Sequence, residues 1–344
     1  MTNIIGGTLE GGTQRIGAFA RLPDLVRQLG ADPGTLLAES GLAANALEDP
    51  EATAPYASVC ALLARIADRT ACPHLGLLVG RMWQLSELGV LGEAVRNSRT
   101  VGDALRTLAV HQHLNSGGGL VFTTEDAGVA ELGYAIYHPR VEGASLYLDA
   151  VLTSGSNYLR ELMGPSCTPT EVLFAHPKPP DPAPYRAVFR VTPRFESEST
   201  VLRFPAAWLA RPVIGADPAK LAGAMSRIDR AGRGALLQQV TRAVRILMLS
   251  GEISGAAAAQ ALAMHRRTLN RRLKAQGTTF QEVLDRVRAE AACQLLEGTR
   301  TSLDDIAATL GYASVSAFMR AFRRWTGVAP GQWRRGTRRD SIRP

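Results

Sequence analysis

Apolar residues recur at helical spacing near the C-terminal end of the chain, where they outline two short helices. The first has an apolar face made of Leu303, Ile306, Ala307 and Leu310. Ser302 stands at its N-cap position, and Gly311 allows the tight turn that ends it. The second starts near Ser314 and has Ala317, Phe318, Ala321, Phe322 and Trp325 on its apolar face and Arg320, Arg323 and Arg324 on the other. Two short helices joined by a glycine turn, the second one cationic, predict a helix-turn-helix.

The same arrangement occurs once more upstream. Residues 256–264 predict a small alanine-rich helix, and residues 265–277 predict a second helix in which Leu269 and Leu273 face inward. The solvent side of this second helix keeps Arg266, Arg267, Asn270, Arg271 and Lys274. A further helical segment, about 279–297, runs between the two units. The pattern therefore predicts an all-α C-terminal domain with two helix-turn-helix units joined by a linking helix.

The N-terminal part has a different, mixed pattern. Residues 1–15 are rich in Gly and Thr and are expected to be poorly ordered, and residues 21–114 are mostly helical in pattern. Alternating runs then predict a β-hairpin, a helix follows, and short strands come after it. The predicted elements are the hairpin at 120–124 and 130–137, a helix at 144–163, strands at 170–175, 187–191 and 200–204, and a helix from 206.

Breaks in these patterns divide the chain into domains. We expect an N-terminal domain at 1–212, a linker at 213–234 that contains Pro218 and four glycines, a C-terminal domain at 235–335 with the two helix-turn-helix motifs, and a basic tail at 336–344. The fold class predicted is multidomain α+β, with an N-terminal mixed α/β domain and a C-terminal all-α domain.

Charge separates the same two parts. The chain has 344 residues and a net charge of +8, and residues 240–344 hold 18 Lys and Arg against 8 Asp and Glu. The rest of the chain is slightly acidic, so the positive field is confined to the part that carries the helix-turn-helix units, as expected if only that part meets phosphates. A solvated basic face is the plainer alternative.

Little in the sequence indicates other chemistry. The four cysteines, at positions 60, 72, 167 and 293, form no Cys-x-x-Cys pair, which favours free thiols in a reducing compartment. His111 and His113 would point apart on a helix and lack further ligands, so we expect no metal. No catalytic constellation, cofactor motif, signal sequence or membrane span is apparent. We expect a cytoplasmic protein that is not an enzyme and needs no cofactor.

The C-terminal residues resemble the DNA-binding domain of the AraC/XylS family of transcription regulators over about 80 residues. The matching positions are Thr268-Leu-x-Arg-x-Leu273, Gly277, Phe280, Arg288, Ala292, Leu295-Leu296, Ile306-Ala307, Gly311-Tyr312, Ser316-x-Phe318, Arg320-Ala-Phe322 and Gly327-x-x-Pro330-x-x-Trp-Arg334. The family commonly has Ser or Thr where this chain has His265, and histidine is expected to cap a helix poorly. Residues 20–212 also resemble, more weakly, the arabinose-binding-like domain of one subgroup, through Glu171-Val-x-Phe174-x-His176-Pro-x-Pro179 and later aromatic positions.

The resemblance implies a sequence-specific regulator that binds double-stranded promoter DNA as a homodimer, responds to a small-molecule effector and contacts RNA polymerase. It makes residues 1–212 the effector-binding, ligand-sensing and oligomerisation domain and residues 235–335 the DNA-binding domain. Arg reads guanine and Asn reads adenine by paired hydrogen bonds in the major groove. The residues expected at bases or phosphates are Arg266, Arg267, Asn270, Arg271, Lys274, Ser314, Val315, Ser316, Met319, Arg320 and Arg323. The candidates for ligand contact, for which core packing is an equal alternative, are Trp83, Tyr134, Tyr137, Tyr147 and Tyr158. A constitutive regulator without effector and a non-specific architectural DNA binder remain alternatives.

Overall fold

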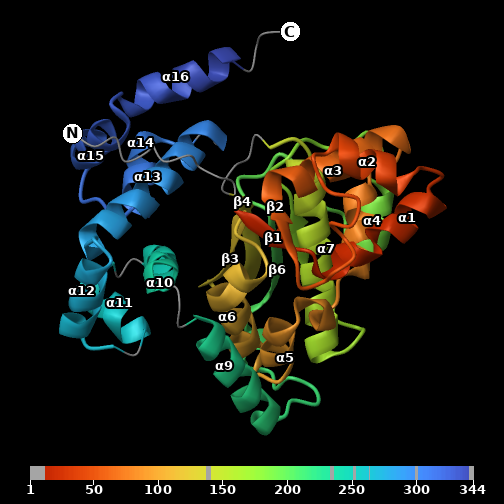
Figure 1. Ribbon diagram of the computed structural model, residues 1–344, viewed down its shortest axis with the longest axis horizontal. Coiled ribbons are helices and arrows are strands. Elements are labelled where there is room, and N and C mark those ends of the chain that lie inside the picture. The colour runs from red at the N-terminus through yellow and green to blue at the C-terminus, as the bar shows by residue number, and fades with distance from the viewer. Residues whose placement is uncertain are drawn as a thin grey trace. The chain divides into compact units, whose positions relative to one another are not determined.

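The computed structural model describes residues 12–136, 141–232, 236–250, 253–262, 264–298 and 301–340 (Figure 1). These residues form two compact units that divide between Asp229 and Arg230. The first unit is mixed α and β and the second is entirely helical, so the predicted fold class is confirmed.

The first unit is built on a four-stranded antiparallel sheet with the order β3-β4-β6-β5. Its strands are β3 (Gly119–Asp126), β4 (Val129–Ile136), β5 (Glu171–Leu173) and β6 (Val201–Pro205). The predicted hairpin is confirmed, with a turn of only two residues. Both turn residues, Ala127 (φ 47°) and Gly128 (φ 81°), have positive φ, which matches the right-handed twist of the flanking strands. A small two-stranded sheet pairs β1 (Thr13–Arg15) with β2 (Thr53–Pro55), so the expected disorder of residues 1–15 is wrong for residues 13–15.

Helix α7 (Ala144–Met163) packs on strands β4 and β6 and lies between the sheet and helices α3 (Tyr56–Arg69) and α4 (Leu75–Met82) (Figure 1). Gly80 allows α4 to approach α7 closely, because a Cβ there would lie 2.4 Å from the carbonyl oxygen of Ala150. The other helices of the first unit are η1 (Gly17–Arg21), α1 (Leu22–Gln28), α2 (Pro33–Glu39), η2 (Leu85–Leu88), α5 (Val90–Arg96), α6 (Val101–His111), η3 (Gln112–Leu114), α8 (Ala183–Phe189) and η4 (Ala206–Ala210). One apolar core joins the sheet to these helices.

The strand predicted at 187–191 is wrong, because residues 187–189 belong to helix α8 and residues 190 and 191 form a bend. Pro182 precedes the helix, and Tyr185 and Phe189, four residues apart, are both buried on one side. The apolar positions therefore follow a helical period rather than an alternating one. The helix ends at Phe189, and its C-cap residue Arg190 adopts the left-handed conformation (φ 61°).

Residues 213–234, expected to be a linker, are mostly structured on the first unit. Val213 lies in its core, and the amide of Ile214 donates to the carbonyl oxygen of Leu162 (3.0 Å). Helix α9 (Pro218–Gly232) then packs Ala224 and Ile228 against Ala94 of α5, beside which it lies in Figure 1. The sequence did not predict this helix, because its glycines and few large apolar residues are typical of a linker. Small residues can equally well form the face that packs against a neighbouring helix.

The second unit contains α10 (Leu236–Ser250), α11 (Gly255–Ala261), α12 (Arg266–Ala275), α13 (Phe280–Gly298), α14 (Leu303–Thr309), α15 (Val315–Thr326) and α16 (Pro330–Asp340). It has two separate apolar cores. One holds Leu269 and Leu273 of α12 with residues of α10, α11 and α13, and the other holds Phe318, Phe322 and Trp325 of α15 with residues of α13 and α14. Helix α13 contributes to both cores, and α12 and α15 lie towards its opposite ends (Figure 1).

Among the helices of the described residues, none combines the length and the apolar character that crossing a bilayer requires.

Candidate nucleic-acid interface and ligand cavity

Helix α12 turns a polar, mostly cationic face to solvent. Its buried residues Leu269 and Leu273 are fully enclosed, whereas Arg266, Arg267, Asn270, Arg271 and Lys274 are all exposed. These five follow the spacing i, i+1, i+4, i+5 and i+8, which places them on one side of a helix. The expectation that His265 caps this helix poorly is wrong in geometry, because His265 Nδ1 accepts from the amide of Arg267 (3.3 Å).

Helix α15 repeats this arrangement on the second core. Phe318, Phe322 and Trp325 are fully buried, whereas Ser316, Met319, Arg320 and Arg323 are exposed on the opposite side. The Oγ of Ser314 accepts from the amide of Ala317 (3.3 Å), so Ser314 is the N-cap, and its hydroxyl hydrogen and second lone pair remain for another partner. Val315 is half-buried and packs against the core. Most of the residues predicted from the sequence on this helix therefore share one accessible face.

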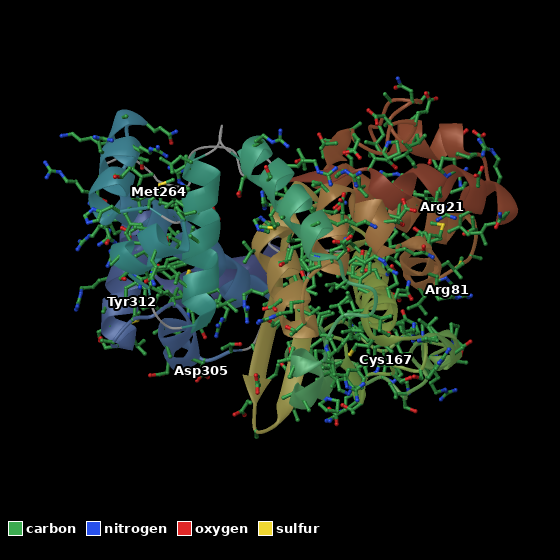
Figure 2. The ribbon with its side chains drawn as sticks, turned by 90° about the horizontal axis from the view of Figure 1, so that it is seen from below. Arg21, Arg81, Cys167, Met264, Asp305 and Tyr312 are labelled. Carbon is green, nitrogen blue, oxygen red and sulfur yellow. The ribbon has the colours of Figure 1, made fainter. Side chains whose placement is uncertain are left out.

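Other arginines of the second unit are used inside the fold. Arg324 forms an ion pair with Asp285 of α13 (2.9 Å). The guanidinium of Arg288 lies 4.6 Å from the ring centroid of Tyr312, which is labelled in Figure 2, and donates to the carbonyl oxygen of Gly311 (3.3 Å). Arg334 donates to the carbonyl oxygen of Thr301 (2.7 Å).

The cations on the exposed faces differ from these in their partners. Within the described part of the chain, the cationic side-chain groups of six residues form no ion pair and no hydrogen bond: Arg266, Arg267, Arg271, Lys274, Arg320 and Arg323. An exposed cation without a carboxylate partner keeps its charge available for a phosphate or a base edge. The second unit therefore presents two cationic helix faces on separate cores.

The first unit encloses a cavity of about 40 Å³ between α7, the sheet and the segment around η3. Four of the five aromatic residues singled out in the sequence line it, and all four are buried: Trp83, Tyr134, Tyr147 and Tyr158. The fifth, Tyr137, lies outside the described residues. The remaining lining residues are Leu88, Leu108, Gln112, Asn115, Val121, Leu132, Gly133, Val151, Leu152, Ser154, Gly155 and Leu202. Sequence reasoning missed the polar residues Gln112, Asn115 and Ser154, since no local pattern joins the segment around η3 to α7.

A hydrogen-bond network links two of the tyrosines of the cavity, Tyr134 and Tyr147. The hydroxyl of Tyr147 donates to Oε1 of Gln14 (2.7 Å), and Oγ of Ser116 lies 3.3 Å from Tyr147 Oη and 3.4 Å from Tyr134 Oη. Burial raises the pKa of Tyr147 well above its usual value, so the phenol remains neutral. The indole N–H of Trp83 is buried and has no hydrogen-bond partner among the described residues.

A second buried polar cluster adjoins α7 away from this cavity. Tyr185 donates to Oδ2 of Asp149 (2.6 Å), and Nε2 of His176 lies 3.0 Å from Oδ1 of the same carboxyl group. Burial raises the pKa of Asp149. Burial opposes a charge on His176, but the hydrogen bond and the charge of Asp149 outweigh it and raise the pKa of the imidazole. The sequence indicated only that His176 lies at a strand end.

No group of three or more His, Cys, Asp or Glu side chains gathers in a metal-binding arrangement within the described ranges. The rings of His111 and His113 have centroids 6.2 Å apart and are tilted by 50°.

Two helix-turn-helix units with exposed cationic faces define a DNA-binding protein of the helix-turn-helix class. A family model described as a helix-turn-helix domain matches residues 258–336, and a model described as the N-terminal arabinose-binding domain of AraC transcription regulators matches residues 30–213. The second match covers more than half of the chain. The chain therefore belongs to the AraC family of transcription regulators, and its relatives are regulators rather than enzymes.

Relatives match nearly the whole chain. The ornithine utilization regulator of Pseudomonas aeruginosa is 30% identical over 91% of this chain and 94% of its own length. The HTH-type transcriptional regulator VirS of Mycobacterium tuberculosis is 28% identical over 90% of this chain and 93% of its own length. Among solved structures, the transcriptional regulator CdpR from Pseudomonas aeruginosa is 25% identical, with a TM-score of 0.43, and the match covers 90% of this chain and 97% of that one.

Proposed function

We propose that this regulator reads promoter DNA with α12 and α15 in two successive major-groove segments. The observation that carries the proposal is the pair of exposed cationic faces, each supported by its own core and joined by the shared helix α13. Helix α13 has 19 residues, which is about 28 Å at 1.5 Å per residue. This length is compatible with the spacing of about 34 Å between successive major-groove segments on one side of DNA.

The residues at these faces have distinct proposed roles. Arg266, Arg267, Asn270 and Arg271 stand near the start of α12 and are proposed to contact base edges, with Lys274 nearer a phosphate. On α15, Ser316 and Met319 are proposed at bases, Ser314 and Val315 at the edge of the contact, and Arg320 and Arg323 at bases or phosphates. The caps and cores beneath these residues support their common orientation.

Selection of bound sequences from random DNA at physiological salt tests the proposal with the full chain. We expect a defined site spanning two groove segments. Arg267→Ala or Asn270→Ala should then cost about 1–3 kcal/mol on that site and relax the preference at one base pair. Equal affinity for every duplex would instead identify a non-specific architectural binder. If the substitution weakens binding equally on all sequences, the residue contacts a phosphate rather than a base.

The effector is proposed to bind in the cavity that Trp83, Tyr134, Tyr147 and Tyr158 line. Gln112 and Asn115 also line it, and Leu114 between them packs against the cluster that holds α9 on α5. A ligand that moves η3 would therefore move the last helix of the first unit, which leads into the DNA-binding unit. Leu114→Ala should weaken the effect of the ligand on DNA affinity without preventing either binding event. An unchanged effect would refute this coupling path.

The regulator is further proposed to act as a homodimer in the cytoplasm, on paired DNA sites, and to contact RNA polymerase. Sedimentation of the full chain with and without its DNA site tests the dimer, since a single chain per site at saturation would exclude it. A constitutive regulator is the nearer alternative, and it predicts that no small molecule raises the melting temperature of the protein.

A further inference from the structure

The lining of the cavity in the first unit contains no charged side chain among the described residues. Its polar members are the amides of Gln112 and Asn115, the hydroxyl of Ser154 and the tyrosine phenols, and the remaining side chains are apolar apart from the indole of Trp83. The phenols of Tyr147 and Tyr158 stay neutral, because burial raises the pKa of each well above its usual value. Every described group that faces the cavity is therefore uncharged at neutral pH.

An uncharged, mostly apolar lining selects strongly against ions. An ionised carboxylate or ammonium group that leaves water for such a site loses its hydration and finds no opposite charge to replace it. A neutral ligand of the same shape loses far less, and its apolar part gains from burial.

The cavity nevertheless holds hydrogen-bonding groups at defined places. The indole N–H of Trp83 has no partner among the described residues, and the ring is fixed by edge contacts with Phe19 (5.0 Å between centroids) and Tyr147 (6.0 Å). A buried donor without a partner is costly, and a ligand with an acceptor oxygen removes that cost. The site is thus suited to a molecule with a hydroxyl or carbonyl oxygen.

Size sets a further condition. A cavity of about 40 Å³ holds about three water molecules. Much of its wall consists of leucine side chains: Leu88, Leu108, Leu132, Leu152 and Leu202. An organic ligand larger than this volume therefore requires some of these leucine side chains to change rotamer.

A smaller pocket of about 10 Å³ shares Trp83 and Asn115 with this cavity. Its lining includes Glu87, whose carboxylate lies 3.6 Å from Arg21. This carboxylate repels an anion from the neighbouring space, and its existing partner reduces its attraction for a cation.

We infer that the effector of this regulator is a compact, uncharged and mainly apolar molecule with one or two hydrogen-bonding oxygens. The inference rests on the proposed function, because it specifies the chemistry of the effector site proposed above. It excludes carboxylate and ammonium ligands from the site.

Three probes of the same carbon skeleton test the inference on the full chain at pH 7: isobutanol, isobutyrate and isobutylammonium. Binding is followed by melting temperature and by tryptophan fluorescence. We expect isobutanol to raise the melting temperature in a saturable manner, and the two ions to bind about tenfold more weakly or worse. Sodium chloride at matched ionic strength is the control for the salts.

A pair of glycine substitutions identifies the site of binding. Gly155 lines the cavity in the middle of α7, and a Cβ there would lie 3.3 Å from Leu202 Cδ1 and 3.4 Å from Leu132 Cδ2, so Gly155→Ala places a methyl group in the cavity. Gly223 is an exposed position of α9 where a Cβ would meet nothing within 4 Å. Gly155→Ala should weaken isobutanol binding about tenfold, whereas Gly223→Ala should leave it unchanged.

The outcomes distinguish a wrong chemical class of effector from a wrong effector site. If isobutyrate or isobutylammonium binds as tightly as isobutanol and Gly155→Ala weakens that binding, the cavity is an effector site but the uncharged class is wrong. If no probe binds, or if Gly155→Ala and Gly223→Ala behave alike, the cavity is not the site and both statements fail.

Discussion

Asp149, His176 and Tyr185 give the first unit a pH dependence whose sign follows from their geometry. The side chain of Asp149 is 2% exposed and that of His176 is 11% exposed. Nδ1 of His176 lies 2.9 Å from the carbonyl oxygen of Pro177, which can only accept a hydrogen bond. Nε2 lies 3.0 Å from Asp149 Oδ1. Both ring nitrogens therefore face oxygen atoms, and an imidazolium beside an ionised carboxylate satisfies every contact.

The two partners both tend to retain a proton, for different reasons. Burial raises the pKa of Asp149, and the contact with Asp149 raises the pKa of His176 in spite of burial. The geometry favours a charged imidazole, because each ring nitrogen of His176 lies within hydrogen-bond distance of an oxygen atom. A histidine whose pKa is raised on folding contributes stability that is fully present below its unfolded value of about 6.5. That stability is lost as pH rises through the folded pKa, by up to about 1.4 kcal/mol per pH unit.

Asp149→Asn should reverse this dependence. The Asn carbonyl can accept from Tyr185, and its amide can donate to Nε2 of a neutral His176 whose Nδ1–H still donates to Pro177. The neutral imidazole is then favoured and its folded pKa falls below 6.5, so the variant loses stability as pH falls through that folded value. Asp149→Ala leaves both partners without an acceptor and should cost about 3–5 kcal/mol at pH 6.

Urea unfolding of the full chain between pH 5.5 and 8.5, followed by far-UV circular dichroism, measures these effects. At every pH, the free energy of unfolding of each variant is subtracted from that of the unchanged protein. The contributions of titrating groups that both proteins share then cancel. The difference between the unchanged protein and Asp149→Asn should shrink with rising pH. A difference that is constant across this range would refute the ion pair, and one that grows with pH would show that His176 is neutral in the fold.

Three further predictions concern the second unit. Arg324→Ala should cost no more than about 1 kcal/mol of stability, by loss of the ion pair with Asp285, and should leave base preference intact. Arg323→Ala should instead weaken DNA binding and lower, by about 1, the slope of the logarithm of affinity against the logarithm of salt concentration. DNA titrations at several salt concentrations compare the two variants. Gly311→Ala should destabilise the unit by about 1–2 kcal/mol in urea unfolding, because the residue has φ 72°; no loss would contradict that conformation. Ser302→Ala should cost about 0.5–2 kcal/mol in the same assay, because the Ser302 hydroxyl caps α14. If it costs no more stability than the same substitution at an exposed serine outside a cap, Ser302 does not have this role.

The second unit was largely predictable from the sequence, because its information is local. Leu269 and Leu273 in α12, and Phe318, Phe322 and Trp325 in α15, stand at helical spacing and are buried as that spacing predicts. The prediction that His265 caps α12 poorly was wrong, because capping depends on the orientation of the ring as well as on the residue type.

The first unit was less predictable, because its elements depend on distant partners. The segment at 187–191 has an apolar run that fits either a strand or a helix, and contact of Tyr185 and Phe189 with the core made it a helix. Helix α9 was not predicted for the same reason. Its small residues form a packing face only against α5, which is distant in sequence.

The sequence by itself determined the class of protein, the two helix-turn-helix units and the faces on which their cations stand. These follow from the period of apolar residues and from caps and turns, which act over a few positions along the chain. Only the tertiary structure decided that Trp83, Tyr134, Tyr147 and Tyr158 meet at one cavity without a charged wall among the described residues, and that Asp149 and His176 form a buried pair. Such groups come together because the packing of α7 against the sheet and its neighbouring helices joins segments far apart in sequence, and no local pattern records that contact.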